Sequence, residues 1–257
     1  MLSARDCSFV LSIILLTSAA FLAGALNAVA GGGTFLTFPA LVFLGMPPIS
    51  ANATSTVAVL PGYIGSALAF RRDIGPAGST GVFGLVVAAL AGGLVGAGLL
   101  LETPSKVFSG IVPWLLLLAT ALFAAGPRIT AWTRRRGHGA AGRLATLIVV
   151  FAVSVYGGYF NGGLGILLLA AFGLLGLRDL NHMNGLKNLL SAVLAVVSSV
   201  TFAIAGIVAW REAALMAVAA MLGGYAGGWA ARRVRPDWLR IGIVAVGLVM
   251  SGLFFVR

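Results

Sequence analysis

Apolar segments long enough to cross a membrane recur along the whole chain. A helix needs about 20 mostly apolar residues to cross a bilayer core, and such windows alternate here with short polar or glycine-rich stretches. They predict eight transmembrane helices, at 9–30, 49–70, 78–101, 105–126, 144–160, 184–210, 212–231 and 237–256. The alternation of apolar and polar residues that marks membrane-spanning strands is missing. We therefore expect an all-α polytopic membrane protein.

Two further apolar segments, 34–46 and 164–177, are too short to cross a bilayer unaided. Each one follows a glycine-rich break, "GGG" at 31–33 and "NGGLG" at 161–165. Irregular backbone persists at membrane depth only where protein or a water-filled cavity covers its free polar groups. The two segments therefore predict half-helices or re-entrant segments.

The two halves of the chain match one another at a constant shift of 131 residues. The two breaks and the two short segments coincide in this register, and so do "AALAGGLVG" at 88–96 and "AAMLGGYAG" at 219–227. We interpret the match as a duplication. It predicts a first transmembrane repeat at 1–127, a basic cytoplasmic linker at 128–143 and a second transmembrane repeat at 144–257.

The orientation of the repeats depends on whether the short segments cross the membrane. If they do not cross, the repeats are parallel; if they do, the second repeat is inverted. Lys and Arg concentrate on the cytoplasmic side of membrane proteins, and the inverted arrangement separates them more unequally. We favour inverted repeats, with the N-terminus outside. Internal repeats that enclose discontinuous helices are typical of secondary transporters, whose substrate sites lie where the repeats meet.

Composition supports a membrane protein and argues against several other classes. Of the 257 residues, 60% are hydrophobic and only 9% are charged, against about 25% charged in soluble domains. The net charge of +11 comes from basic residues at the ends of apolar spans. The preference of Lys and Arg for the cytoplasmic side of the membrane explains this placement better than nucleic-acid binding does. Cys7 is the single cysteine, so an internal disulfide is excluded. The apolar run that begins at residue 9 continues to Ala30, so we expect a retained first span rather than a cleaved signal peptide.

The first break has the chemistry of an anion site. Glycines at Gly31, Gly32 and Gly33 leave the backbone open to close approach and permit a positive φ, and Thr34 is predicted to cap the short helix. A helix N-terminus presents unpaired N–H groups and a partial positive charge. The alternative is that these glycines serve only close helix packing.

The second break repeats this arrangement, and two such N-termini facing one another would bind an anion. Its candidate binding residues are Asn161, Gly162, Gly163 and Gly165.

A polar cluster follows each short segment and begins the next span. The uncharged donors expected to reach an oxyanion are Asn52, Thr54 and Ser55 in the first half, and Asn184 and Asn188 in the second. Lys187 lies inward of the end of its span, where a charge is costly and usually functional. It is the expected counter-charge for an anion, unless its side chain extends to the interface.

Enzymatic, metal and cofactor chemistry is not predicted. All six acidic residues lie at span ends and both histidines are expected in loops, so the paired carboxylates or metal ligands of a membrane protease are missing. The chain has no phosphate-binding loop for ATP. Transport is therefore expected to be passive or coupled to Na⁺ or H⁺, and a homodimer is compatible with the pattern.

The motifs resemble those of the TauE/SafE family of sulfite and organosulfonate exporters over nearly the whole chain. The resemblance is carried by "GGGTFLTFPALVFLGMPPISANATS" at 31–55 and by "N-x-x-K-N" at 184–188. It implies a multi-pass transporter in the bacterial inner membrane that exports sulfite, sulfoacetate or a similar sulfur oxyanion. The second break departs from the first, because Ala170 stands in register with Pro39 and Leu164 with Gly33. An anion channel, or a membrane subunit of a larger complex, is the alternative.

Overall fold

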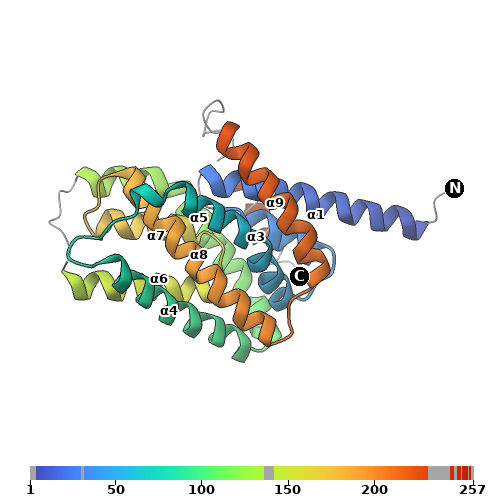
Figure 1. Cartoon of the computed structure of the whole chain (residues 1–257). Helices are drawn as coiled ribbons and strands as arrows, with labels where there is room; N and C mark the ends of the chain where they lie inside the picture. Colours follow the sequence, from blue (N-terminus) through green and yellow to red (C-terminus); the bar gives the residue numbers. More distant parts are fainter. Residues whose placement is uncertain are drawn as a thin grey trace.

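The protein is an all-helical bundle in which two helices are much shorter than the rest (Figure 1). The computed structural model describes residues 4–29, 32–135 and 142–230, and near the C-terminus the helical residues 244–245, 248–249, 251–253 and 255. Within these residues no strand forms beyond a single bridge between Ala77 and Thr80. The helices are α1 (Ala4–Val29), α2 (Thr34–Phe43), α3 (Pro48–Ala69), the 3₁₀ turn η1 (Arg71–Asp73), α4 (Val82–Glu102), α5 (Ser105–Arg135), α6 (Arg143–Tyr159), α7 (Leu164–Leu174), α8 (Leu180–Ile204) and α9 (Trp210–Ala230).

The described helices match the predicted segments closely, with one extension. Helix α5 continues to Arg135, so residues 128–135 of the expected linker are helical. By length and composition, three helical segments of the described chain are apolar enough to cross a membrane by themselves: Val10–Asn27, Val82–Glu102 and Asn181–Ile204. The apolar helices of α2, α6 and α7 are shorter, and α3 carries a polar cluster in its first turns. The expected number of eight spans therefore remains a prediction.

Helices α2 and α7 end in the same way, at positions related by the 131-residue shift. Gly45 and Gly176 have left-handed backbones, with φ of 88° and 92°, a conformation that glycine adopts without steric cost. In each case the N–H of the following residue reaches back to a carbonyl in the last turn, which closes a Schellman motif. These bonds are Met46 N to Leu41 O at 3.1 Å and Leu177 N to Phe172 O at 3.0 Å.

Each half of the chain packs helices against the other half. α1 packs along α9, and α4 packs along α6, so the first helix of each half lies against the fourth helix of the other. Small residues permit this: a Cβ on Gly24 would lie 1.9 Å from the Ala220 carbonyl oxygen, and one on Gly96 would lie 2.1 Å from that of Val155. Glycine is therefore needed at both contacts.

Helices α3 and α8 pack against one another and run antiparallel. Thr54 in the first turns of α3 accepts a hydrogen bond from Ala209 N, just beyond the end of α8, at 3.0 Å. At the opposite end Gly185, near the start of α8, lies against the backbone of Asp73, just beyond α3. The other helices surround this pair.

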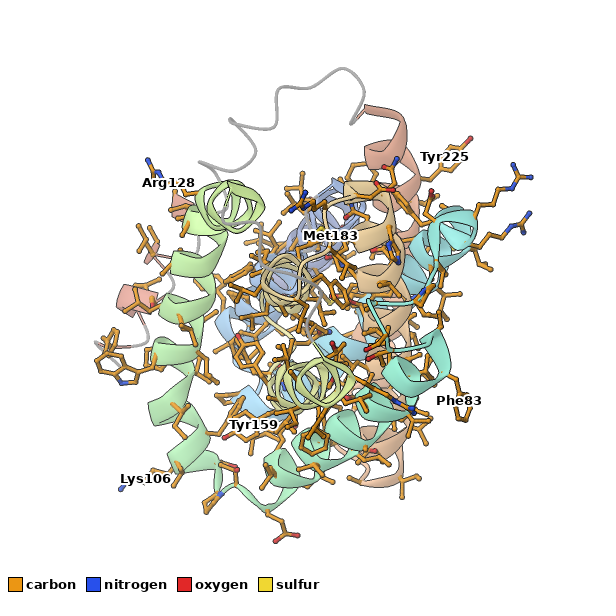
Figure 2. All side chains as sticks on the ribbon, turned by 90° about the vertical axis from the view of Figure 1, so that its left-hand side faces the viewer. Phe83, Lys106, Arg128, Tyr159, Met183 and Tyr225 are labelled. Atoms are coloured by element: carbon orange, nitrogen blue, oxygen red, sulfur yellow. The ribbon has the colours of Figure 1, made fainter. Side chains whose placement is uncertain are left out.

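The outer surface is apolar, as lipid contact requires. Phe83 and Tyr225 are 83% and 86% exposed and point away from the bundle in Figure 2, whereas Met183 is buried inside it. Lys106 and Arg128 lie at the periphery (Figure 2). A second set of polar side chains is buried in the interior, among them Thr34, Asn52, Asn161 and Lys187, and these mark the candidate site.

Candidate functional site

The two helix breaks lie against one another in the centre of the protein. Thr34 is the first residue of α2, and its hydroxyl lies 3.5 Å from the carbonyl oxygen of Asn161, in the break before α7. The ring of Phe38, one turn into α2, packs edge-on against Phe160 with centroids 5.5 Å apart. Residues that are 127 positions apart in sequence therefore form one contact region.

Helix α3 completes this region with two polar side chains. Asn52 Nδ2 donates to the carbonyl oxygen of Tyr159, the last residue of α6, at 3.0 Å. The hydroxyl of Tyr63 faces the side chains of Thr34 and Asn161 and interacts with them, but the contacts do not have the distance and angle of a hydrogen bond. We call Thr34, Asn52, Tyr63 and Asn161 the break cluster. All four residues are 1–3% exposed, so the cluster is closed to solvent in this conformation.

The break cluster contains buried polar atoms that have no hydrogen-bond partner. They are Asn52 Oδ1, the hydroxyl of Tyr63, and both Nδ2 and Oδ1 of Asn161. A buried polar atom left unpaired costs about 1 to 3 kcal/mol, and most such atoms in proteins are paired. Atoms of this kind at one place are suited to a polar ligand or to ordered water.

The first break differs in detail from the prediction. Thr34 does not cap α2: the residue at the N-cap is Gly33, and no side chain caps it in the predicted way. Instead Asn27, in the last turn of α1, accepts a hydrogen bond from Gly33 N at 2.8 Å. The backbone of Gly33 is right-handed, with φ of −59°. Gly32 is buried and its carbonyl accepts from α2, and Gly31 lies outside the described residues.

The second break has the left-handed glycine that the sequence predicted. Gly163 has φ of 74° at the N-cap of α7. The carbonyl of Gly162 accepts a hydrogen bond from the Tyr156 hydroxyl at 2.6 Å, and a Cβ on Gly162 would lie 2.5 Å from the ring of Phe160. Gly165 is buried in the first turn of α7. Glycine at position 162 therefore leaves room for the ring of Phe160, which packs against Phe38 of α2.

Two of the predicted donors are occupied by other contacts. Thr54 Oγ1 holds the α8–α9 connection through Ala209 N. Ser55 shares a hydrogen bond of 2.5 Å with Thr37 on α2. Both side chains fix α3 in place. Asn52 is the residue of this stretch that belongs to the break cluster; its Nδ2 is occupied by Tyr159 O, and its unpaired atom is the acceptor Oδ1.

Lys187 forms a separate polar group on α8 with its neighbours. Its side chain is 2% exposed and Nζ donates to Asn184 Oδ1 at 3.1 Å. Asn188 is 3% exposed. Within the described part of the chain no carboxylate pairs with this ammonium group. Lys187 does not extend to the surface of the structure, contrary to the interfacial alternative.

The prediction that both histidines lie in loops is wrong for His182, which is in the first turn of α8. The carboxylate of Asp179 caps that helix by accepting from Asn181 N at 2.9 Å. His182 Nε2 has no hydrogen-bond partner and faces Gly75. His138 lies outside the described residues. No group of three or more metal-ligating side chains occurs in the described ranges.

Sequence reasoning missed two polar residues at the breaks, Asn27 and Tyr63. Asn27 was detectable as an amide at the end of an otherwise apolar span, four positions before the first of the three glycines. Tyr63 lies among small and aliphatic residues eight positions beyond Ser55, and its hydroxyl is directed to the breaks only by the packing of α3.

Interrupted helices that begin at a buried, uncharged polar cluster are a feature of membrane transporters. The comparisons agree with this class. The family model for the sulfite exporter TauE/SafE matches residues 16–254, and the chain therefore belongs to this family. The expectation from the sequence motifs is confirmed.

Curated relatives carry transporter names. A probable membrane transporter protein of Haemophilus influenzae is 27% identical over 214 residues, which cover 79% of this chain and 78% of the relative. The probable membrane transporter protein YfcA of Escherichia coli K12 is 29% identical over 232 residues, 90% of this chain and 85% of the relative. No solved structure matches the chain significantly. The protein is a multi-pass membrane protein of a transporter family.

Proposed function

We propose that the protein is a secondary transporter that moves a small anion out across the bacterial inner membrane. The anion is a sulfur oxyanion or an organosulfonate, such as sulfite or sulfoacetate. One observation carries the proposal: α2 and the break before α7 meet at a buried cluster whose polar atoms lack partners. The membership of the TauE/SafE family supports the choice of anion.

The break cluster is suited to an anion because helix N-termini and hydrogen-bond donors attract negative charge there without a charged side chain. The N-terminus of α2 begins at Thr34 and that of α7 lies three residues beyond Asn161, and each helix N-terminus contributes a partial positive charge. The Tyr63 hydroxyl and Asn161 Nδ2 are unpaired donors. Such a site holds a singly charged oxyanion and still releases it, because no fixed cation opposes its departure.

The scaffold is proposed to be two inverted repeats. Helices α3 and α8 correspond at the 131-residue shift and run antiparallel, as inversion requires. The packing of α1 along α9 and of α4 along α6 is equivalent in the two halves, because in both cases the first helix of one half contacts the fourth helix of the other. In transporters of this kind, movement of one part against the other exposes a central site to each side in turn. The closed break cluster would then be an occluded state.

An inside-negative potential favours export of an anion. It contributes about 2.3 kcal/mol per elementary charge for every 100 mV. The described acidic residues lie at helix ends, so the break cluster has no carboxylate to relay a proton. Export down the electrochemical gradient is the mechanism that these residues support.

The test is a flux assay with purified protein in liposomes. Radiolabelled sulfite, thiosulfate, sulfate and a taurine-like sulfonate are loaded, and a potential is imposed with potassium and valinomycin. Saturable flux that unlabelled anion competes is expected for the parent. Gly32→Leu and Asn161→Ala should lower it strongly, while Gly98→Ala, which faces open space on α4, should not. Non-saturating conductance, or equal flux in all four proteins, would overturn the proposal.

A further inference from the structure

Helix α8 carries a buried polar face that the break cluster does not include. The residues on it are Asn184, Lys187, Ser191 and Ser198, spaced by three, four and seven positions. At 3.6 residues per turn their side chains fall within about 60° of one another around the helix. We call these four residues the α8 stripe. The last three are 1–2% exposed and Asn184 is half-buried.

The neighbouring face of α8 is apolar. Met183, Leu186, Leu190 and Leu194 belong to one buried hydrophobic cluster that also contains residues of α4 and α7. A buried helix could be apolar on every side. The stripe therefore places polar groups at positions where hydrocarbon would be the simpler choice.

The two serines of the stripe are not satisfied by their own helix. Buried Ser and Thr in a helix usually donate to the carbonyl four residues back, and Thr201 on α8 does so to Val197 O at 2.8 Å. The hydroxyls of Ser191 and Ser198 have no partner. Ser199 is also unpartnered, but it points about 100° away from Ser198. Two fully buried, unpartnered hydroxyls in line with a buried ammonium indicate that the stripe faces a polar guest.

The α8 stripe extends along its helix past the level of the helix breaks. Tyr63 belongs to one small buried cluster with Ala192 and Ala195 of α8, while its hydroxyl faces Thr34 and Asn161. Ser191 therefore lies at the level of the break cluster. Asn184 is seven residues closer to the start of α8, which at 1.5 Å per residue is about 10 Å. Lys187 lies between these two levels.

We propose that the α8 stripe lines the route by which the anion travels to the break cluster and past it: Asn184 and Lys187 lie on one side of the cluster's level, Ser191 lies at that level and Ser198 lies beyond it. Lys187 is the charged binding step on that route. The inference rests on the proposed anion transport and extends it to residues beyond the central site. Lys187 attracts the anion, and the neutral hydroxyls of Ser191 and Ser198 replace water around it without holding it. The first half of the chain has no equivalent of Lys187: the residue in register with it is Thr56, whose hydroxyl donates to a backbone carbonyl within α3.

Thiol labelling tests whether the stripe is lined by water and anions. In a Cys7→Ser background, single cysteines are introduced as Lys187→Cys, Ser191→Cys and Ser198→Cys, with Leu186→Cys and Leu190→Cys as equally buried controls. The probe is the anionic, membrane-impermeant reagent 2-sulfonatoethyl methanethiosulfonate. Stripe positions should react several-fold faster than the controls, and excess sulfoacetate should slow them. Sulfite is not used as protectant because it cleaves the mixed disulfide.

The labelling result does not depend on flux, so the two proposals can fail separately. Equal or faster labelling of the Leu186 and Leu190 positions would overturn the route even if the parent transports anions. Stripe labelling that sulfoacetate slows would uphold the route even if none of the four radiolabelled anions moves.

Removal of the hydroxyls gives a second, independent readout. Ser191→Ala and Ser198→Ala delete hydroxyl groups that have no hydrogen-bond partner. If the two serines had only a structural role, these substitutions would leave anion flux unchanged. We expect anion flux to fall about three- to tenfold, the effect of one lost hydrogen bond, while the melting temperature stays the same or rises. Thr201→Val, which removes a paired hydroxyl from the same helix, should lower the melting temperature and spare flux. Unchanged flux in both serine variants would contradict the route.

Discussion

The substitution Tyr63→Phe separates a binding role from a structural one by the sign of its effects. The hydroxyl is buried and unpartnered in the closed conformation, where such a group costs about 1 to 3 kcal/mol. Its removal should therefore leave the free energy of unfolding unchanged or raise it by up to that amount. A hydrogen bond from this hydroxyl to an anion is worth about 1.5 to 3 kcal/mol. The apparent affinity for the anion should fall roughly 10- to 150-fold.

Both quantities can be measured on one preparation. The concentration for half-maximal flux in liposomes reports anion affinity, and thermal unfolding in detergent without anion reports stability. Tyr156→Phe is the matched control, because its hydroxyl donates to Gly162 O at 2.6 Å. Its loss should destabilise the protein by about 1 kcal/mol. Tyr225→Phe, on the exposed surface, should change neither. If Tyr63→Phe destabilised the protein as Tyr156→Phe does and left affinity unaltered, the assignment of Tyr63 would be wrong.

Three further predictions, made with four substitutions, test other parts of the structure. Gly33→Ala places a Cβ 2.5 Å from the carbonyl oxygen of Ala23; it should destabilise the protein by about 1 to 3 kcal/mol and abolish saturable flux, as thermal unfolding and the liposome assay would show. Lys187→Gln should weaken anion affinity about tenfold or more and reduce its dependence on ionic strength, measured as half-saturation at two salt concentrations. Gly45→Ala and Gly176→Ala force left-handed backbones on alanine and should each lower stability by about 1 to 2 kcal/mol, with similar shifts in melting temperature.

Control variants and comparisons test whether these three effects are specific. Gly98→Ala lies in open space on α4 and should be neutral or stabilising, since alanine is the better helix former. Lys106→Gln removes an exposed charge and should not alter half-saturation. Equal effects in control and test variants would contradict the corresponding assignment. A destabilisation at Gly45 without one at Gly176 would contradict the equivalence of the two helix ends.

The two halves have the same outline but different chemistry. In the 131-residue register Asn52 corresponds to Met183, and Tyr63 to Leu194. The first half therefore supplies neutral hydrogen-bonding groups near the breaks, and the second half packs hydrocarbon at the matching positions. The second half instead carries a charge, because Lys187 stands where α3 has Thr56. The single anion site that we propose is assembled from both halves and is not duplicated.

The sequence by itself determined the membrane class, the helices and the position of both breaks. Apolar length and glycine spacing are local properties, so α2 and α7 were located to within a few residues. The family followed from motifs that are contiguous in sequence. Helix α5 continues beyond the predicted span to Arg135, because the basic residues from Arg128 onward are compatible with a helix as well as with a linker.

Only the tertiary structure decided which polar groups meet. Thr34 was expected to cap its own helix, but the fold directs its hydroxyl to Asn161 and gives the backbone N–H of Gly33 to Asn27. Thr54 and Ser55 looked equivalent to Asn52 in sequence, and packing assigned them to structural contacts. Partners more than 100 residues apart are set by how α3 crosses α8 and by how far the glycines let the breaks approach. Those distances depend on the whole bundle, which no local pattern encodes.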